Sequence, residues 1–143
     1  MRELQRNARI SNAELAGRIN LSPTPTLRRL RKLENSGMIK GYTAVLDREA
    51  LDLHTAAFVF IKLERNSTQN AQAFEQQIEK IPEVTGCWIV AGEHDYVLHI
   101  VTGDLEDYER LVKERLAGIK VVTHIESIIV LKQVLERNAL PLT

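Results

Sequence analysis

Two short segments near the start of the chain carry apolar residues at the spacing of a helix. The first segment predicts a helix with Leu15, Ala16 and Ile19 on its inner side. Ser11 and Glu14 have the S-x-x-E spacing of a capping box, which satisfies free amides at a helix start. We therefore expect a helix that begins just after Ser11 and buries one narrow stripe.

The second segment combines a narrow apolar stripe with a dense basic face. Leu27, Leu30 and Leu33 recur at helical spacing and predict the buried side of a second helix. Ser22 is expected to cap its start through the hydroxyl, and the prolines that follow are tolerated in a first turn. Four basic residues lie mostly off the stripe: Arg28, Arg29, Arg31 and Lys32.

The joint between these two segments is short. Asn20 tolerates the left-handed conformation that closes the first helix, and Gly37 is expected to close the second. Two short helices joined by a tight turn predict a helix-turn-helix, and the basic second helix suits a DNA major groove. Residues 39–46 indicate extended chain, either a small wing or a strand leading out. The alternative interpretation of the basic segment is a solvated, charged surface helix.

Beyond residue 54 the pattern changes to apolar strands separated by helices. Apolar runs predict strands at residues 56–63, 84–91, 96–101 and 121–131. Helical spacing predicts helices from about residue 70 to the stop at Pro82, and over residues 105–116. The order strand-helix-strand occurs twice, which predicts a ferredoxin-like βαββαβ domain. The expected fold class is α+β, with a winged-helix-like helix-turn-helix domain in front.

Both faces of the predicted sheet are apolar. A sheet with helices on one face normally shows polar residues on the other. Residues 56–63 instead place aliphatic residues on one face and Ala56, Phe58 and Phe60 on the other. We therefore expect a second copy of the chain to cover the open face, giving a homodimer. The alternative is that the basic domain folds back over it.

The neutral net charge conceals a split between the two halves. Residues 1–50 carry ten Arg and Lys against five Asp and Glu, and residues 51–143 carry nine against fourteen. An excess of positive charge in one half favours a nucleic-acid partner for that half. Together with the change of pattern, it predicts a DNA-binding domain at 1–46, a connector at 47–54 and a second domain at 55–143.

Composition excludes several further classes. The chain has no run of eighteen apolar residues, so we expect no membrane partner, and no signal peptide is visible. The single cysteine, Cys87, rules out an internal disulfide and fits a reducing cytoplasm. Glu93, His94 and Asp95 adjoin one another, but three consecutive residues rarely converge on one ion. We therefore expect no metal site, no cofactor and no catalytic residues.

Short motifs along the whole chain occur in a joint order that is more specific than any one of them. They are Asn7–Ser11, Glu14–Ala16, Leu21–Pro25, Arg29–Leu30, Leu33–Glu34, Gly37, Ile39, Gly41–Tyr42, Gly92–Tyr96 and Ala139–Leu142. Through these motifs the chain resembles the Lrp/AsnC family of leucine-responsive, or feast/famine, transcriptional regulators. The resemblance implies a dimer that assembles further, commonly to an octamer, binds double-stranded DNA and responds to an amino acid or a related small metabolite.

That resemblance makes the helix from Pro23 to Ser36 the recognition helix. A bidentate contact between arginine and guanine gives sequence discrimination, whereas phosphate contacts give affinity without sequence information. Arg29 has the alternative role of a structural residue that pairs within its own domain. The expected DNA-binding set is Thr24, Thr26, Arg28 and Arg29 toward the groove, Arg31 and Lys32 nearer the phosphates, and Ser22 at the helix start.

The resemblance also implies an effector pocket between neighbouring dimers. Asp95 would accept hydrogen bonds from a ligand ammonium group, and its alternative is a hydrogen bond to local backbone in a turn. The expected effector-binding residues are Gly92, Glu93, His94, Asp95 and Tyr96 in the loop, with Ser127 and Ile128 on the last strand.

Two departures from the family pattern bear on these expectations. The chain starts within a segment where the family has a complete helix, so we expect reduced core support for the helix-turn-helix. Residues 119–122 are Ile-Lys-Val-Val, where the family has Leu-Pro-Gly-Val. Two alternative functions stay open: an enzyme resembling the siroheme decarboxylases, which share this architecture, and a metabolite-binding or interaction module without DNA binding.

Overall fold

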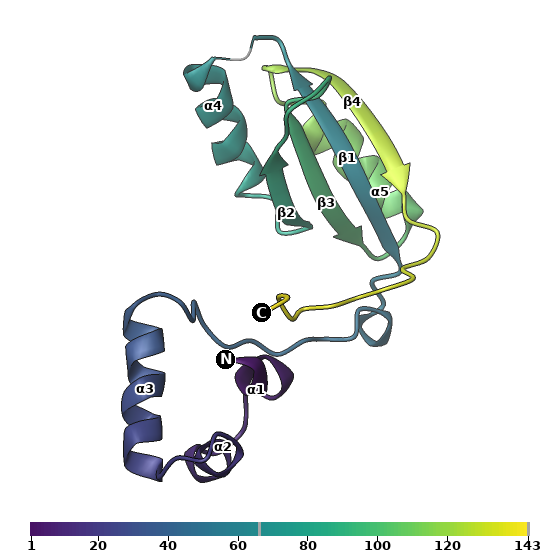
Figure 1. Ribbon diagram of the computed structural model, residues 1–143. Helices are drawn as coiled ribbons and strands as arrows, with labels where there is room; N and C mark the ends of the chain where they lie inside the picture. The colour runs from purple at the N-terminus through teal and green to yellow at the C-terminus, as the bar shows by residue number, and fades with distance from the viewer. Residues whose placement is uncertain (66, 143) are drawn as a thin grey trace. The chain divides into compact units, whose positions relative to one another are not determined.

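The computed structural model describes residues 1–65 and 67–142 (Figure 1). The chain forms two compact units, one of Met1–Val45 with Val134–Thr143 and one of Leu46–Gln133. The predicted boundaries assigned everything after residue 54 to the second domain. The structure groups the final segment with the first unit instead, and it groups the connector with the second.

The first unit contains helices α1 (Arg2–Arg6), α2 (Asn12–Arg18) and α3 (Pro23–Asn35). The predicted capping box is confirmed: the Glu14 amide donates to Ser11 Oγ at 3.2 Å, and the Ser11 amide donates to Glu14 Oε2 at 3.1 Å. Asn20 has a φ of 53° and Gly37 a φ of 72°, so both positions adopt the left-handed conformation expected after a helix.

The core of the first unit is smaller than its apolar pattern predicts. Leu15 and Ala16 are buried as expected, but Ile19 and Leu27 remain 40% and 37% exposed. The expected inward positions of Ile19 and Leu27 are therefore wrong, and Leu30 and Leu33 are only half-buried. The reason is that α1 is short and buries none of its side chains, so it adds little apolar surface.

The start of α3 differs from the expected cap. Ser22 occupies the N-cap position, but its side chain makes no capping hydrogen bond. An N-cap side chain bonds to the second or third amide of the helix, and Pro25 removes the third. Thr26 instead donates its hydroxyl to the Ser22 carbonyl oxygen at 2.9 Å. After α3, residues 40–47 form neither helix nor strand, so this segment builds no wing.

The final segment of the chain is hydrogen-bonded to α1 within the first unit. Gln5 Nε2 donates to the Leu140 carbonyl at 3.2 Å, and the Leu140 amide donates back to Gln5 Oε1 at 2.6 Å. Arg2 Nη2 donates to the Leu142 carbonyl at 3.0 Å. These paired contacts attach the end of the chain to its first helix.

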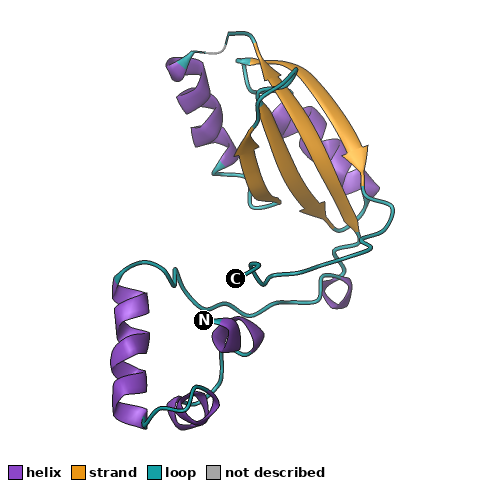
Figure 2. Cartoon of the chain, in the orientation of Figure 1, coloured by secondary structure: helices purple, strands orange, loops and turns teal. Residues whose placement is uncertain are grey.

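The second unit is a four-stranded antiparallel sheet with two helices, which confirms the ferredoxin-like prediction (Figure 2). The strand order is β2-β3-β1-β4. A π-helical turn, Val112–Leu116, continues α5 where a single helix was expected. The elements in chain order are β1 (Thr55–Leu63), α4 (Thr68–Ile78), β2 (Val84–Ile89), β3 (Tyr96–Thr102), α5 (Leu105–Leu111) and β4 (Val122–Ile129).

The two faces of this sheet differ in what covers them. One face of β1 is fully buried and packs in a single core with residues from α4, β3 and α5, namely Ala57, Val59, Ile61, Phe74, Leu98 and Leu111. The opposite face has no helix over it in this unit, and Figure 1 shows α5 behind the strands. Phe58, Trp88 and Ile128 on this open face remain 39%, 52% and 49% exposed.

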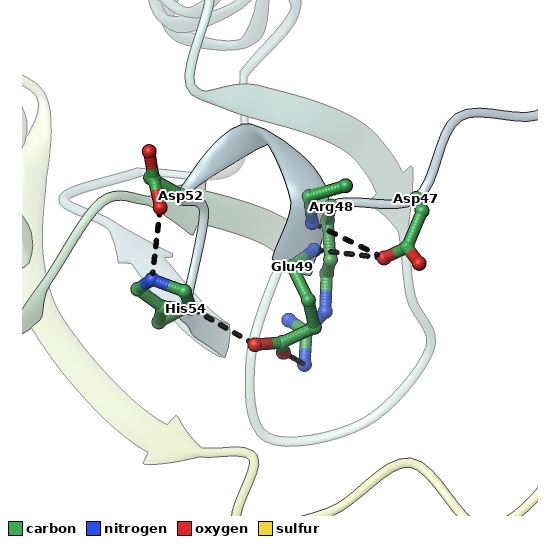
Figure 3. A network of polar contacts seen from close by, with 6 residues as sticks. Asp47, Arg48, Glu49, Asp52 and His54 are labelled. Atoms are coloured by element: carbon green, nitrogen blue, oxygen red, sulfur yellow. Dashed lines mark hydrogen bonds and ion pairs between the residues drawn. The ribbon is translucent and has the colours of Figure 1, made fainter.

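The connector folds onto the second unit through a polar network (Figure 3). Asp47 Oδ1 accepts the Glu49 amide at 2.9 Å, at the start of a 3₁₀ turn, Glu49–Leu51. His54 Nδ1 lies 2.8 Å from Glu49 Oε2, and the His54 amide donates to the Gly103 carbonyl at 3.0 Å. Across the described ranges, no helix is long and apolar enough to cross a membrane.

Candidate functional site

The outer face of α3 carries a concentration of positive charge. Arg28, Arg29, Arg31 and Lys32 are all exposed. Within residues 1–65 and 67–142, none of these four side chains forms an ion pair with an acidic group. The proposed internal pairing of Arg29 is therefore not observed. Unpaired cations on one helix leave a positive potential that attracts a polyanion.

Part of this face lines a shallow hollow. Its volume is about 610 Å³. Arg29 lies outside this hollow, so the basic face extends beyond it. The residues that line it are Thr24, Leu27, Arg28, Arg31, Lys32, Asn35 and Ser36.

One member of the expected DNA-binding set, Thr26, has a structural role. Thr26 is only 1% exposed, and its hydroxyl is donated to the Ser22 carbonyl, so it offers nothing to a groove. The Thr26 side chain faces the core of the first unit, so its expected role as a groove contact does not fit this position. Ser22 is exposed and remains at the exposed start of α3, beside Thr24.

The loop between β2 and β3 places its residues in different directions. Gly92 has a φ of 152°, and Gly92 and Glu93 are exposed. Asp95 is tied to the end of β1: its amide donates to the Ile61 carbonyl at 2.9 Å, and Oδ2 accepts the Leu63 amide at 2.8 Å. The backbone-bonding alternative for Asp95 is thus observed, with one carboxylate oxygen used in this way.

Tyr96 is a core residue. It is 3% exposed, its ring centroid lies 4.7 Å from that of Phe74, and its hydroxyl donates to Glu75 Oε1 at 2.7 Å. Burial and the neighbouring Glu75 carboxylate strongly raise the pKa of Tyr96. Its expected role as an effector contact is not supported by this placement, because the side chain faces the α4 side of the sheet.

The two effector residues expected on β4, Ser127 and Ile128, lie on opposite faces of the sheet. Ser127 pairs with Val59 of the buried face, and it accepts a hydrogen bond from the Tyr108 hydroxyl on α5. Ile128 pairs with Phe58 and is exposed on the open face. Neighbouring strand residues point to opposite faces, so these two cannot line one pocket within a single chain.

The structure brings His94 together with two residues that sequence reasoning missed. His94 Nε2 lies 3.2 Å from Glu126 Oε2, and the His94 and His124 rings lie 6.1 Å apart between centroids. His124 and Glu126 are two residues apart on β4 and so share one face. The sequence predicts that His124 and Glu126 share one face of the last strand. It does not predict that this face lies beside His94 in the loop.

Comparisons with known proteins agree over nearly the whole chain. A family model described as the Lrp/AsnC ligand binding domain matches residues 56–140, and one described as a winged helix-turn-helix DNA-binding domain matches residues 1–40. The leucine-responsive regulatory protein of Escherichia coli K12 is 38% identical over 140 residues, covering 98% of this chain and 85% of that protein.

Solved structures give the same result. A transcriptional regulator in complex with L-methionine from Neisseria meningitidis aligns with a TM-score of 0.92 at 34% identity, covering 97% of this chain and 90% of that one. A feast or famine regulatory protein from M. tuberculosis, complexed with L-methionine, aligns with a TM-score of 0.87 at 32% identity, covering 96% and 91%.

Proposed function

This chain belongs to the Lrp/AsnC family of transcriptional regulators, and from that premise we propose that it binds double-stranded DNA through the exposed face of α3. The observation that carries the proposal is the set of unpaired cations on that face, Arg28, Arg29, Arg31 and Lys32. Because the proposed partner is DNA, we propose that the protein acts in the cytoplasm and is not an enzyme.

The contacts divide into two kinds. Arg28 and Arg29, with Thr24, lie nearer the start of α3, the end that enters a major groove in helix-turn-helix proteins. Arg31 and Lys32 follow along the helix and suit phosphate contacts. A bidentate arginine–guanine pair gives about 1–3 kcal/mol of discrimination, whereas each phosphate contact adds to the salt dependence of binding.

Fluorescence anisotropy on a duplex selected from a random library tests this assignment. Replacing both arginines, as Arg28→Ala with Arg29→Ala, is expected to weaken binding at least about tenfold and to flatten its salt dependence. Lys80→Ala is the matched control, because Lys80 is exposed and lies in the second unit. Unchanged affinity and salt dependence in the double variant would reject the recognition face.

We further propose that the chain responds to an amino acid or a related small metabolite, and that a second copy completes the pocket. Two relatives are complexes with L-methionine. In this chain Tyr96 is buried, Ser127 is hydrogen-bonded to Tyr108 on α5, and Gly92 and Glu93 are exposed in the loop, so the described residues of one chain do not gather the expected set into one pocket. In homodimers that assemble to an octamer or another higher oligomer, residues of a neighbouring copy would complete the pocket.

A thermal-shift screen over free amino acids tests the response, because a ligand that binds only the folded chain raises its melting temperature by mass action. We expect one or a few amino acids to raise it and the rest to leave it unchanged. Light scattering with the same ligands then reports whether assembly changes, since an effector shifts assembly only if it prefers one state. A flat response across the whole panel would reject the proposed effector class.

A further inference from the structure

A cluster of potential metal ligands lies on the open face of the sheet in the second unit. His94 comes from the loop between β2 and β3, and His124 and Glu126 come from β4. One ligand atom from each of these residues lies within 4.8 Å of the other two. In the sheet register, Glu126 pairs with Phe60 and His124 pairs with Lys62, so β1 holds both β4 residues at fixed positions.

We propose that His94, His124 and Glu126 bind a divalent transition-metal ion of the Zn²⁺ type. Two imidazoles and one carboxylate match the ligands that zinc and its neighbours prefer, whereas Ca²⁺ and Mg²⁺ take oxygen ligands. With metal–ligand bonds of about 2.0–2.2 Å, tetrahedral coordination separates two ligand atoms by roughly 3.3 Å. The observed distance from His94 Nε2 to Glu126 Oε2 is 3.2 Å.

His94, the loop member of the cluster, is held in place by its neighbours without a metal ion. The His94 side chain is 18% exposed, and the Phe60 ring packs against it with 5.2 Å between ring centroids. The next residue, Asp95, is bonded to β1 through both its amide and its carboxylate. The His94 and His124 rings are 25° from parallel. The three ligand atoms thus lie within 4.8 Å of one another, and the pair from His94 and Glu126 is already at the spacing of two ligands on one ion.

Three protein ligands leave at least one coordination position open. Water or a group from a second copy of the chain would fill it, as in metal sites with three protein ligands. The alternative role for these residues is a direct polar contact between His94 and Glu126, which needs no metal. The inference depends on neither DNA binding nor the proposed amino-acid response, because the ligands belong to one chain.

Titration of the full, tag-free chain with Co²⁺ tests the proposal. We expect one equivalent per chain to produce the visible d–d absorption of a Co²⁺ site with nitrogen ligands, and Zn²⁺ to displace it. His124→Ala and Glu126→Gln should each weaken Zn²⁺ binding by at least about tenfold in isothermal titration calorimetry, because each removes one ligand.

The control is His54→Gln, which removes an exposed histidine outside the cluster and should leave metal binding unchanged. Circular dichroism of each variant shows whether the sheet has folded, and two independent ligand variants keep the test decisive. The direct polar contact alone predicts no Co²⁺ spectrum. That result, or equal Zn²⁺ affinity in wild type and His124→Ala, would overturn the proposal.

Discussion

His54 is a single exposed residue whose neighbours give it a defined electrostatic role. Nδ1 lies 2.8 Å from Glu49 Oε2, and Nε2 lies 3.6 Å from Asp52 Oδ1. The hydrogen bond that His54 donates to the Glu49 carboxylate is the main reason that the pKa of His54 is raised. The folded chain therefore holds this proton more tightly than the unfolded chain, so protonated His54 stabilises the fold below its unfolded pKa of about 6.5.

Stability from this contact is lost as the pH rises through the raised folded-state pKa. His54→Gln removes the titration, so the wild type should be more stable than the variant at about pH 5.5 and lose that advantage by about pH 8. Thermal unfolding followed by circular dichroism across this range measures the difference. The difference should also shrink at high salt, because the pair is exposed. An identical pH profile in both proteins would contradict the assigned role.

At the scale of an element, the start of α3 lacks the expected capping hydrogen bond and has a different one, from Thr26 to Ser22. Pro25 removes the third amide of the helix, one of the two that an N-cap side chain can bind, and the Ser22 hydroxyl makes no capping bond. The Thr26 hydroxyl instead donates to the Ser22 carbonyl from a buried position. The first turn is therefore stabilised from inside the unit rather than from its exposed end.

Thr26→Val keeps the shape of the side chain and removes this hydrogen bond. We expect the free energy of unfolding to fall by about 1 kcal/mol, the usual net value of such a bond, with little direct effect on DNA affinity. Urea denaturation measures the first quantity. Thr24→Val is the matched control, because Thr24 is exposed on the same turn and should leave stability unchanged. Equal stability of wild type and Thr26→Val would show that the bond contributes nothing.

The order of the elements could be predicted because it depends on local periodicity. Helix ends were also predictable where one residue type decides them, as at Asn20 and Gly37. The exposure of Ile19 and Leu27 could not be predicted, because it depends on how little α1 covers.

The candidate sites were predictable only where local spacing determines them, and not where contacts between distant elements do. The basic face of α3 follows from the spacing of its own residues. The grouping of His94 with Glu126 depends on the register between β1 and β4, which places Phe60 opposite Glu126. No local pattern encodes that pairing. Tyr96 and Ser127 belong to the expected effector set, yet hydrogen bonds to Glu75 and Tyr108 occupy their hydroxyls, and a sequence motif does not separate these roles.

At the scale of the whole molecule, we propose that the open face of the sheet contacts a second copy of the chain. Phe58 and Trp88 expose 39% and 52% of their surface there, and Ile128 exposes 49%. Apolar residues grouped on one face are typical of interaction sites. A charge placed on this face should therefore disrupt a homodimer that buries it.

Phe58→Glu should reduce the molar mass measured by multi-angle light scattering to that of one chain, because a dimer would bury two unpaired carboxylates. Leu105→Glu is the matched control. Leu105 is also exposed, at 59%, but it lies at the start of α5 rather than on the open face. The mass of this variant should equal that of the wild type. A wild-type protein with the mass of a single chain would reject the dimer.

The hydrogen bonds between Gln5 and Leu140 hold the end of the chain in the first unit, where the chain also begins. The chain passes between its two units twice, once between Val45 and Leu46 and again between Gln133 and Val134. One proteolytic nick in either crossing therefore leaves an uncut peptide route from one unit to the other. After a cut between Val45 and Leu46, hydrogen bonds such as those of Gln5 with Leu140 still join residues 1–45 to a final segment that stays covalently attached to the second unit. In sequence, the second unit is therefore an insertion within the first.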